Sequence, residues 1–152
     1  EIVPGTLKLE ITESALGADP QSRHALERLR TLGAGLAIDD FGTGLSTLGQ
    51  LKDLPFDTVK IDRSFLARHA GTQDENDGTV ILGSIVSLAH DLKRNVIVEG
   101  VENESDAEWL KSMGCEFAQG FYFSPPLPAS EALNFIALHY DTLSSGAAGV
   151  SG

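Results

Sequence analysis

The chain is 152 residues long, about the length of one domain, and 41% of its residues are hydrophobic, which is enough to bury a core. Its formal net charge is −11, from 22 acidic and 11 basic residues, and a surface this acidic repels nucleic-acid backbones and anionic lipids. A single cysteine excludes an internal disulfide, and no apolar run approaches the roughly 20 residues that span a membrane. We therefore expect a cytoplasmic domain, alone or within a larger membrane-anchored protein, with no nucleic-acid partner and no direct membrane insertion.

Five segments have the composition and alternation of strands, and helical patterns separate them. The predicted strands cover residues 6–12, 35–40, 57–62, 95–99 and 116–123. The predicted helices run from Pro20 to just before Gly33, over 46–54, over 79–93, over 105–113 and onward from near Pro128. Strands that alternate with helices imply a parallel sheet with helical crossovers, in either an open sheet or part of a barrel.

Polar segments set three further boundaries. Ser105 and Glu108 have the spacing of a capping box at the start of the fourth helix. Residues 71–78 (GTQDENDG) are polar and predict a mobile connection. Residues 144–152 (SSGAAGVSG) have the composition of a loose tail, so the chain is expected to divide into a domain over 1–143 and a flexible C-terminal tail.

Two adjacent carboxylates, Asp39 and Asp40, end the second predicted strand, and a glycine-rich turn at residues 41–44 follows at once. Buried carboxylates are costly unless a cation neutralises them. Glycines let the backbone turn sharply and come close to a ligand. The pattern indicates a bound cation or a strong cationic partner at this strand end.

Each of the five predicted strands carries a polar or charged residue that can face inward near its C-terminal end. In chain order these residues are Glu10, Asp39, Lys60 with Asp62, Glu99, and Gln119. Parallel strands bring their C-terminal ends to one rim, where both barrels and open α/β sheets bind ligands. The convergence favours a functional site under either architecture.

The carboxylates Glu10, Asp39, Asp40 and Glu99 are hard oxygen ligands, with no histidine or cysteine beside them. That composition suits Mg²⁺ or Mn²⁺. Four carboxylates exceed what a single Mg²⁺ takes from a protein. Two ions about 3.5–4 Å apart would use all four, activate a water and clamp an in-line phosphoryl displacement.

Lys60 would then hold the attacking water or a phosphate oxygen, and Gln119 would orient a ligand group without adding charge. Structural alternatives stay open for three further acids. Asp62 has about even odds of being a helix or loop cap. Glu13 lies past Glu10 in a turn, where its alternative is to bond the backbone amides of a neighbouring loop. Glu102 has the position of a solvated acid in the first turn of the following helix.

These residues lie in five ordered motifs that resemble the EAL domain family, the phosphodiesterases that linearise cyclic di-GMP. Residues 9–14 (LEITES) resemble the family's E-x-T-E segment, and residues 39–44 (DDFGTG) match its D-D-F-G-T-G loop. Residues 60–62 (KID), 99–102 (EGVE) and 119–121 (QGF) match its K-I-D, E-G-V-E and Q-G-[FY] motifs. The resemblance covers roughly residues 3–140.

The resemblance implies a modified TIM-type barrel, two Mg²⁺ or Mn²⁺ ions, and hydrolysis of cyclic di-GMP to linear pGpG. It assigns Glu10, Asp39 and Asp40 to the metals. It assigns Glu99 to a metal or to activation of water, and Lys60 to positioning that water.

The same resemblance assigns Asp62, Glu102 and Gln119 to the substrate or to support of the groups that bind it. Glu13 is implied to anchor the loop at residues 41–46, close to which family members dimerise. We therefore expect a homodimer, and an upstream sensory or GGDEF-type domain in the parent protein.

The sequence departs from the family at its start, because the Glu-Ala-Leu motif and the strand with the metal-binding Asn both belong upstream of Glu1. The expected fold is therefore a partial TIM-type (β/α) barrel of the α/β class, the C-terminal two-thirds of the domain, with the first strands missing. The strand at 7–11 would keep an unpaired edge, which invites pairing with another chain. The expected function is a phosphodiesterase whose chemistry is complete only with the missing part. The alternatives are a degenerate EAL domain that senses cyclic di-GMP or contacts a protein, and an unrelated metal-dependent phosphohydrolase.

Overall fold

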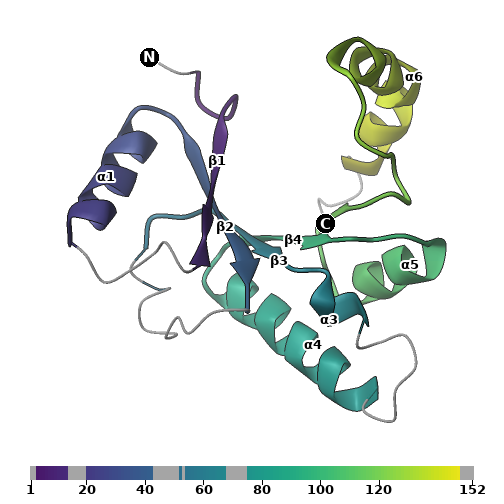
Figure 1. Cartoon of the computed structure of the whole chain (residues 1–152), viewed down its shortest axis with the longest axis horizontal. Coiled ribbons are helices and arrows are strands. Elements are labelled where there is room, and N and C mark those ends of the chain that lie inside the picture. The colour runs from purple at the N-terminus through teal and green to yellow at the C-terminus, as the bar shows by residue number, and fades with distance from the viewer. Residues whose placement is uncertain (1–2, 14–19, 43–51, 53, 68–74, 148–152) are drawn as a thin grey trace.

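The computed structural model describes residues 3–13, 20–42, 52, 54–67 and 75–147. Its strands form one parallel sheet in the order β1-β2-β3-β4-β5, so each strand lies beside its neighbour in sequence (Figure 1). The strands are β1 (Lys8–Thr12), β2 (Gly35–Phe41), β3 (Thr58–Ile61), β4 (Asn95–Glu99) and β5 (Phe117–Gln119). The predicted parallel α/β sheet is confirmed.

Helices provide the crossovers that parallel pairing requires. The described helices are α1 (Pro20–Thr31), α3 (Ser64–Ala67), α4 (Glu75–Asp91), α5 (Glu104–Ser112) and, after the last strand, α6 (Ala129–Ala147). The first joins β1 to β2, the next two join β3 to β4, and α5 joins β4 to β5. The helix predicted over 46–54 falls almost entirely outside the described residues.

One face of the sheet packs against α1, α3, α4 and α5 and forms the core. Ile38, Val59 and Val98 lie on this face, each almost inaccessible to solvent, and Leu82 of α4 and Leu110 of α5 pack into the same cluster. Figure 1 shows α4 running beneath the sheet. Fully burying such a side chain contributes about 1.5–3 kcal/mol, so this layer fixes the strands and leaves the opposite face available.

The opposite face carries the residues predicted to face inward. Residues paired side by side in neighbouring strands point to the same face. The register therefore places there a set of polar side chains that includes Glu10, Asp39, Lys60, Glu99 and Gln119. Alternation predicted this face for Glu10, Asp39 and Lys60, and the position at the strand end predicted it for Glu99 and Gln119.

Two helix starts differ from the expectation. α4 begins at Glu75, so the last part of the segment 71–78 is helical and only residues 71–74 lie outside the described chain. Acids near a helix N-terminus are favourable, which explains the earlier start. α5 is capped by Asn103, whose Oδ1 accepts a 2.9 Å hydrogen bond from the backbone N–H of Asp106. The predicted capping box at Ser105 is therefore wrong, because Asn103 provides the acceptor two residues earlier.

β5 is shorter than predicted, and α6 is longer. The chain leaves the sheet after Gln119, where Phe123 N–H donates to the Gly120 carbonyl at 3.1 Å and forms a turn. α6 continues to Ala147, so residues 144–147 of the predicted tail are helical. The division of the chain at residue 143 stays a prediction.

The ends of the sheet and the last helix are open in the described part of the chain. β1 and β5 each have one strand neighbour there, which agrees with the predicted unpaired edge at β1. α6 stands clear of the sheet in Figure 1, and Leu133, Ile136 and Leu138 on it are exposed. No described helix combines the length and apolar character needed to cross a lipid bilayer.

Candidate active site

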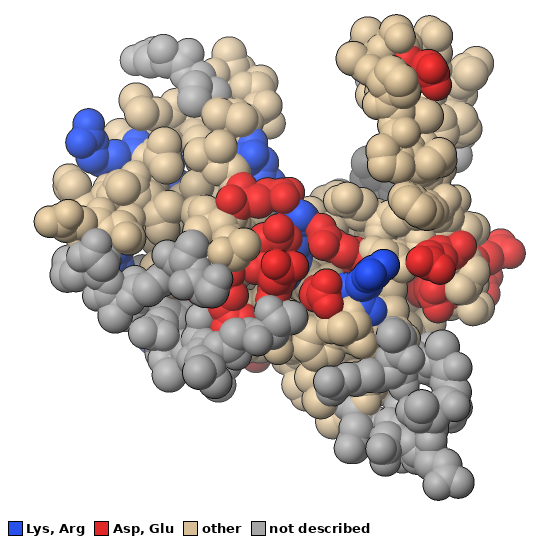
Figure 2. Space-filling model, in the orientation of Figure 1, with Lys and Arg blue, Asp and Glu red and all other residues tan. Residues whose placement is uncertain are grey.

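Lys60 lies at the centre of the polar face. Its side chain is only 6% exposed, and Nζ lies 2.8 Å from Glu10 Oε2, 3.0 Å from Asp39 Oδ1 and 2.6 Å from Glu99 Oε1. Three different strands therefore supply acids around the one lysine of β3. Figure 2 shows acidic atoms gathered in the middle of this face with basic atoms among them.

The surroundings of Lys60 keep it charged. Burial by itself would lower the pKa of Lys60, because it favours the neutral amine. Interactions of the ammonium with Glu10, Glu99 and Asp39 outweigh that effect and raise the pKa above its ordinary value. The site therefore contains a permanent cation among its carboxylates at physiological pH.

Asp39 and Asp40 both reach the site because β2 is irregular near its end. Ile38 pairs with Val59 and Phe41 pairs with Ile61, so three steps along β2 match two along β3. Asp40 has a φ of 54°, in the left-handed region that Asp tolerates better than most residues. An extra residue of this kind breaks the alternation that would otherwise send neighbouring side chains to opposite faces.

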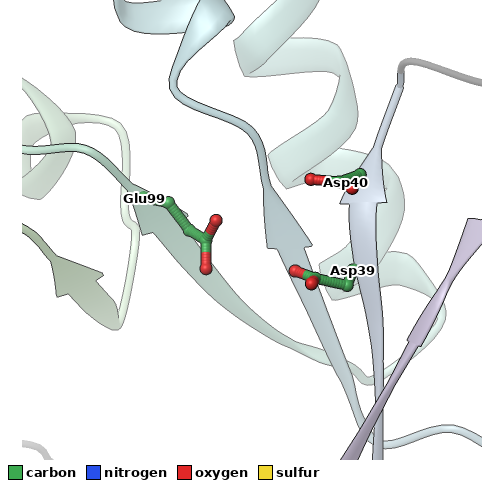
Figure 3. A group of neighbouring side chains, drawn as sticks. All are labelled: Asp39, Asp40 and Glu99. Atoms are coloured by element: carbon green, nitrogen blue, oxygen red, sulfur yellow. The ribbon is translucent and has the colours of Figure 1, made fainter.

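Asp39, Asp40 and Glu99 form a group that could hold a metal ion. Each offers a carboxylate oxygen that lies within 4.8 Å of the others. In Figure 3 their side chains extend from β2 and β4 into the same space.

The surroundings of the Asp39 carboxylate are also suited to a cation. Its Oδ1 is buried and lies 3.0 Å from the Lys60 ammonium, with no further hydrogen-bond partner among the described residues. Such an oxygen could also bind a metal, since carboxylate oxygens are the ligands that Mg²⁺ and Mn²⁺ prefer. Glu10, also predicted as a ligand, lies outside the group of three and pairs with Lys60.

A cavity of about 310 Å³ adjoins the carboxylates and holds the three predicted substrate-binding residues. It is lined by Asp62, Arg63, Glu99, Gly100, Glu102, Gln119, Gly120 and Phe121. Its volume is at the lower end of the range for small-molecule sites. Glu99 belongs both to this wall and to the acidic group, so the cavity and the candidate metal site are continuous.

Four residues of this wall received no role from the sequence. Gly100 has a φ of 74°, and a Cβ there would lie 2.4 Å from the Cβ of Arg63. The glycine thus lets the stem of Arg63 lie against the loop after β4. A Cβ at Gly120 would lie 2.0 Å from the Val101 carbonyl oxygen, and the exposed ring of Phe121 follows. The sequence signal was their place in or beside these motifs: Gly100 lies in the motif at 99–102, Gly120 and Phe121 lie in the motif at 119–121, and Arg63 follows the motif at 60–62.

Asp62 makes a structural contact as well as lining the cavity. Its Oδ1 accepts a 2.9 Å hydrogen bond from Ser64 N–H at the start of α3. Hydrogen bonds from the Ser64 hydroxyl and backbone hold the pKa of Asp62 below its ordinary value. The predicted alternative of a cap is therefore confirmed, beside a position in the cavity wall.

Glu13 contacts the backbone just after β2. It is buried, and its Oε2 accepts a 3.0 Å hydrogen bond from the backbone N–H of Gly42. Gly42 has a φ of 93°, and a Cβ there would lie 2.6 Å from Phe65 Cζ. The hydrogen bond from Gly42 holds the backbone two residues after Asp40. Residues 43–46 of the predicted loop lie outside the described chain.

A family model described as the EAL domain matches residues 1–126 of the chain. The chain belongs to the EAL domain family. The strands of EAL domains form a TIM-type barrel, so the five-stranded sheet is a partial barrel of that type, as expected.

Curated relatives support this assignment. The chain is 42% identical over 135 residues to the bifunctional diguanylate cyclase/cyclic di-GMP phosphodiesterase MucR of Pseudomonas aeruginosa, which covers 88% of this chain and 19% of that protein. It is 38% identical over 133 residues to the cyclic di-GMP phosphodiesterase RocR of the same organism, covering 87% of this chain and 33% of RocR. This EAL chain thus spans a third or less of the length of either relative.

A solved structure agrees with the fold. The MucR phosphodiesterase in complex with c-di-GMP matches with a TM-score of 0.78 and 41% identity. The match covers 85% of this EAL chain and 51% of the solved one. The described sheet and its helices therefore correspond to about half of that structure.

Proposed function

We propose that this EAL chain is the C-terminal part of a phosphodiesterase domain that hydrolyses cyclic di-GMP to linear pGpG. The observation that carries the proposal is the approach of Asp39, Asp40 and Glu99 within 4.8 Å, beside buried Lys60 and at the edge of a cavity. Hard ligands, a fixed cation and an adjoining cavity are the parts that metal-assisted phosphoryl transfer needs.

Asp39, Asp40 and Glu99 would hold one Mg²⁺ or Mn²⁺, and Glu10 would contribute to a second. When bound, such ions lower the pKa of a coordinated water and polarise the phosphoryl oxygens. Lys60 can only donate hydrogen bonds, so it would orient the attacking water or hold a phosphate oxygen.

Glu99 would accept the proton of the attacking water, because it touches both Lys60 and the cavity. The water oxygen bonds to phosphorus while the bond from phosphorus to the 3′ oxygen breaks. The departing 3′ oxygen takes up a proton, which leaves pGpG with a phosphate at its 5′ end.

The cavity would hold one nucleotide of the substrate. Glu102 and Asp62 offer acceptors for guanine N–H groups, and the amide of Gln119 offers both a donor and an acceptor. Phe121 presents an exposed ring for stacking on the base. Arg63 is the basic side chain of the described cavity wall and would face a phosphate.

The proposed phosphodiesterase would also dimerise and be regulated by another domain of its parent protein. A homodimer would form near the loop after β2, with Glu13 as its anchor through Gly42. An upstream sensory or GGDEF-type domain would control the phosphodiesterase in the cytoplasm. The printed name of MucR, a bifunctional cyclase and phosphodiesterase, supports this arrangement by analogy.

The test compares this chain with a version extended by the upstream residues of its parent protein. Release of pGpG from cyclic di-GMP is followed by chromatography, with Mg²⁺, with Mn²⁺ and with chelator. We expect metal-dependent release by the extended form, and a loss of at least about 10²-fold in Glu99→Gln. Glu108→Gln is the matched control, because Glu108 is an exposed acid on α5 outside the cavity wall.

Two results would contradict the proposal. Binding of cyclic di-GMP by the extended, metal-saturated form without release of pGpG would favour the non-catalytic sensor. Equal rates for Glu99→Gln and Glu108→Gln would place the chemistry elsewhere.

A further inference from the structure

The segment at residues 62–67, which follows β3 and includes α3, contacts the chain at the ends of both neighbouring strands. A Cβ at Gly42, directly after β2, would lie 2.6 Å from Phe65 Cζ and 3.0 Å from Phe65 Cε2. A Cβ at Gly100, directly after β4, would lie 2.4 Å from the Cβ of Arg63. The backbone at both strand ends therefore rests directly on side chains of this segment.

Hydrogen bonds and burial fix the Phe65 ring in place. Asp62 Oδ1 accepts a 2.9 Å hydrogen bond from Ser64 N–H, and the Asp62 carbonyl accepts one from Phe65 N–H at 3.2 Å. Phe65 is only 6% exposed, and it belongs to the same core cluster as Phe41. The ring is therefore a fixed surface against which Gly42 packs.

Asp40 has a backbone conformation that needs such support. Its φ of 54° lies in the left-handed region, which costs free energy for a residue with a Cβ. A strained conformation persists only where the surrounding structure holds it in place. Before Asp40 that support is the irregular pairing of β2 with β3. After it, Glu13 and Phe65 both contact Gly42, so a shift of Gly42 would let Asp40 relax.

We propose that Phe65 is a positioning residue for the candidate metal site. Its ring holds the backbone at Gly42, and this keeps the Asp40 carboxylate beside Asp39 and Glu99. Phe65 is neither one of these acids nor part of the cavity wall, so it acts only through Gly42. This inference rests on the proposed function, and it gives an apolar residue of the core a role in metal binding.

Phe65→Leu removes the ring atoms Cε and Cζ, which face Gly42, and keeps an apolar side chain in the core. Phe56→Leu is the matched control, because it removes the same atoms from a phenylalanine that is 3% exposed and lies before β3. The nearest atoms to a Cβ at Gly42 belong to Phe65 and Ile85, so the control leaves this contact intact. Both variants should lose stability, since each shortens one core side chain.

Hydrogen exchange of the Gly42 amide, followed by NMR without metal, reports the contact directly. This N–H donates to Glu13, so exchange requires the segment after β2 to move. We expect exchange to be about tenfold faster in Phe65→Leu than in Phe56→Leu, which corresponds to about 1.4 kcal/mol of local stability. Equal exchange rates in the two variants would overturn the inference.

Calorimetric titration with Mn²⁺, without nucleotide, reports the acidic group. We expect Phe65→Leu to bind Mn²⁺ about ten- to a hundredfold more weakly than the unchanged chain, the usual loss when a residue that orients a metal ligand is removed. Phe56→Leu should bind it like the unchanged chain. If the two variants bind Mn²⁺ equally well, Phe65 has no role beyond packing and the inference is wrong.

A double variant tests whether Phe65 acts through Gly42. Gly42→Ala alone should also weaken Mn²⁺ binding, because its Cβ would meet the Phe65 ring. Leucine lacks the atoms that the alanine Cβ would meet, so Gly42→Ala with Phe65→Leu should lose less affinity than the two single losses combined. Full additivity of the two losses would show that Phe65 acts by another route.

These results are separable from the proposed function. Equal Gly42 exchange and equal Mn²⁺ binding in the two leucine variants, together with pGpG release by the extended form, would overturn the inference and leave the phosphodiesterase standing. The expected differences between the variants, without any pGpG release, would support the positioning role and refute the phosphodiesterase.

Discussion

Replacing Gly120 with alanine tests how the cavity wall is built. The turn after β5 meets the loop after β4 at Val101, whose N–H donates to the Gln119 carbonyl at 3.1 Å and whose carbonyl accepts from Tyr122 N–H at 3.0 Å. A Cβ at Gly120 would lie 2.0 Å from that carbonyl oxygen and 2.3 Å from that nitrogen. Both bonding atoms of Val101 would have to move.

The expected cost follows from these contacts. Observed Cβ atoms essentially never approach another atom within 3.0 Å, so Val101 or the turn must shift by roughly an ångström, and Val101 is fully buried. Two weakened hydrogen bonds cost about 0.5–1.5 kcal/mol each, and overpacking costs about 1–3 kcal/mol. We expect Gly120→Ala to lower the free energy of unfolding by about 3 kcal/mol, or Tm by about 6–12 °C.

Gly83→Ala is the matched control, since it makes the same chemical change on α4. The nearest atom to a Cβ there is the flexible end of Met113, at 3.4 Å. Alanine is favoured over glycine inside a helix by about 0.5–1 kcal/mol, so this variant should be slightly more stable than the unchanged chain. Urea unfolding followed by circular dichroism measures both. Equal stability of the two variants would refute the claim that the Gly120 contact constrains the wall.

Two further predictions concern stability away from the candidate site. Burial alone would raise the pKa of Asp57, but hydrogen bonds from Thr58, Leu36 and Lys8 lower it below its ordinary value. Asp57 therefore stabilises the fold fully above its unfolded pKa near 3.8, and this stabilisation is lost as the pH falls below that value. Asp57→Asn should therefore cost about 1–2 kcal/mol at pH 7 and progressively less below about pH 4 in urea titrations, whereas a pH-independent cost would contradict the assignment. Asn103→Ala should lower the free energy of unfolding by about 1 kcal/mol, and Ser105→Ala by only a few tenths of a kcal/mol. A larger drop in Tm for Ser105→Ala than for Asn103→Ala would instead identify Ser105 as the helix cap.

The sequence was most informative where one physical signal was unopposed. The strand at 95–99 matches β4 (Asn95–Glu99) residue for residue, because a short run of three β-branched apolar residues is bounded by the polar residues Asn95 and Glu99. Alternation predicted the inward face for Lys60, and the position of Glu99 at the strand end predicted the same face for it; the two side chains lie 2.6 Å apart. Period and face are local properties, so they can be deduced from the sequence.

The sequence was insufficient in two situations. In one, two neighbouring residues could both cap a helix; in the other, contacts with distant segments determined which residue a position requires. Asn103 and Ser105 are both good caps, and only the direction of the incoming chain selects Asn103. The cavity wall depends on Gly100 and Gly120, whose need for glycine comes from Arg63 and Val101 on other segments. Neighbours of that kind are not visible in the sequence of either loop.

The end of β2 shows how one irregularity resolves a conflict in the sequence. Regular alternation after Ile38 would send Asp39 to the polar face, Asp40 to the core and Phe41 to the polar face. With the extra residue between the paired positions of Ile38 and Phe41, Phe41 lies beside Ile61 and is buried, and Asp40 is exposed.

The balance of energies at this strand end favours the irregular form. The left-handed conformation of Asp40 costs about 1–2 kcal/mol, whereas burying Phe41 contributes about 1.5–3 kcal/mol. A regular strand would lose that contribution and would also bury the Asp40 carboxylate among apolar residues, which is costlier still. The hydrogen bond from Gly42 to Glu13 holds the backbone immediately beyond. The convergence of Asp39 and Asp40 is therefore a consequence of packing Phe41, and any substitution that makes residue 41 polar should release the two carboxylates from each other.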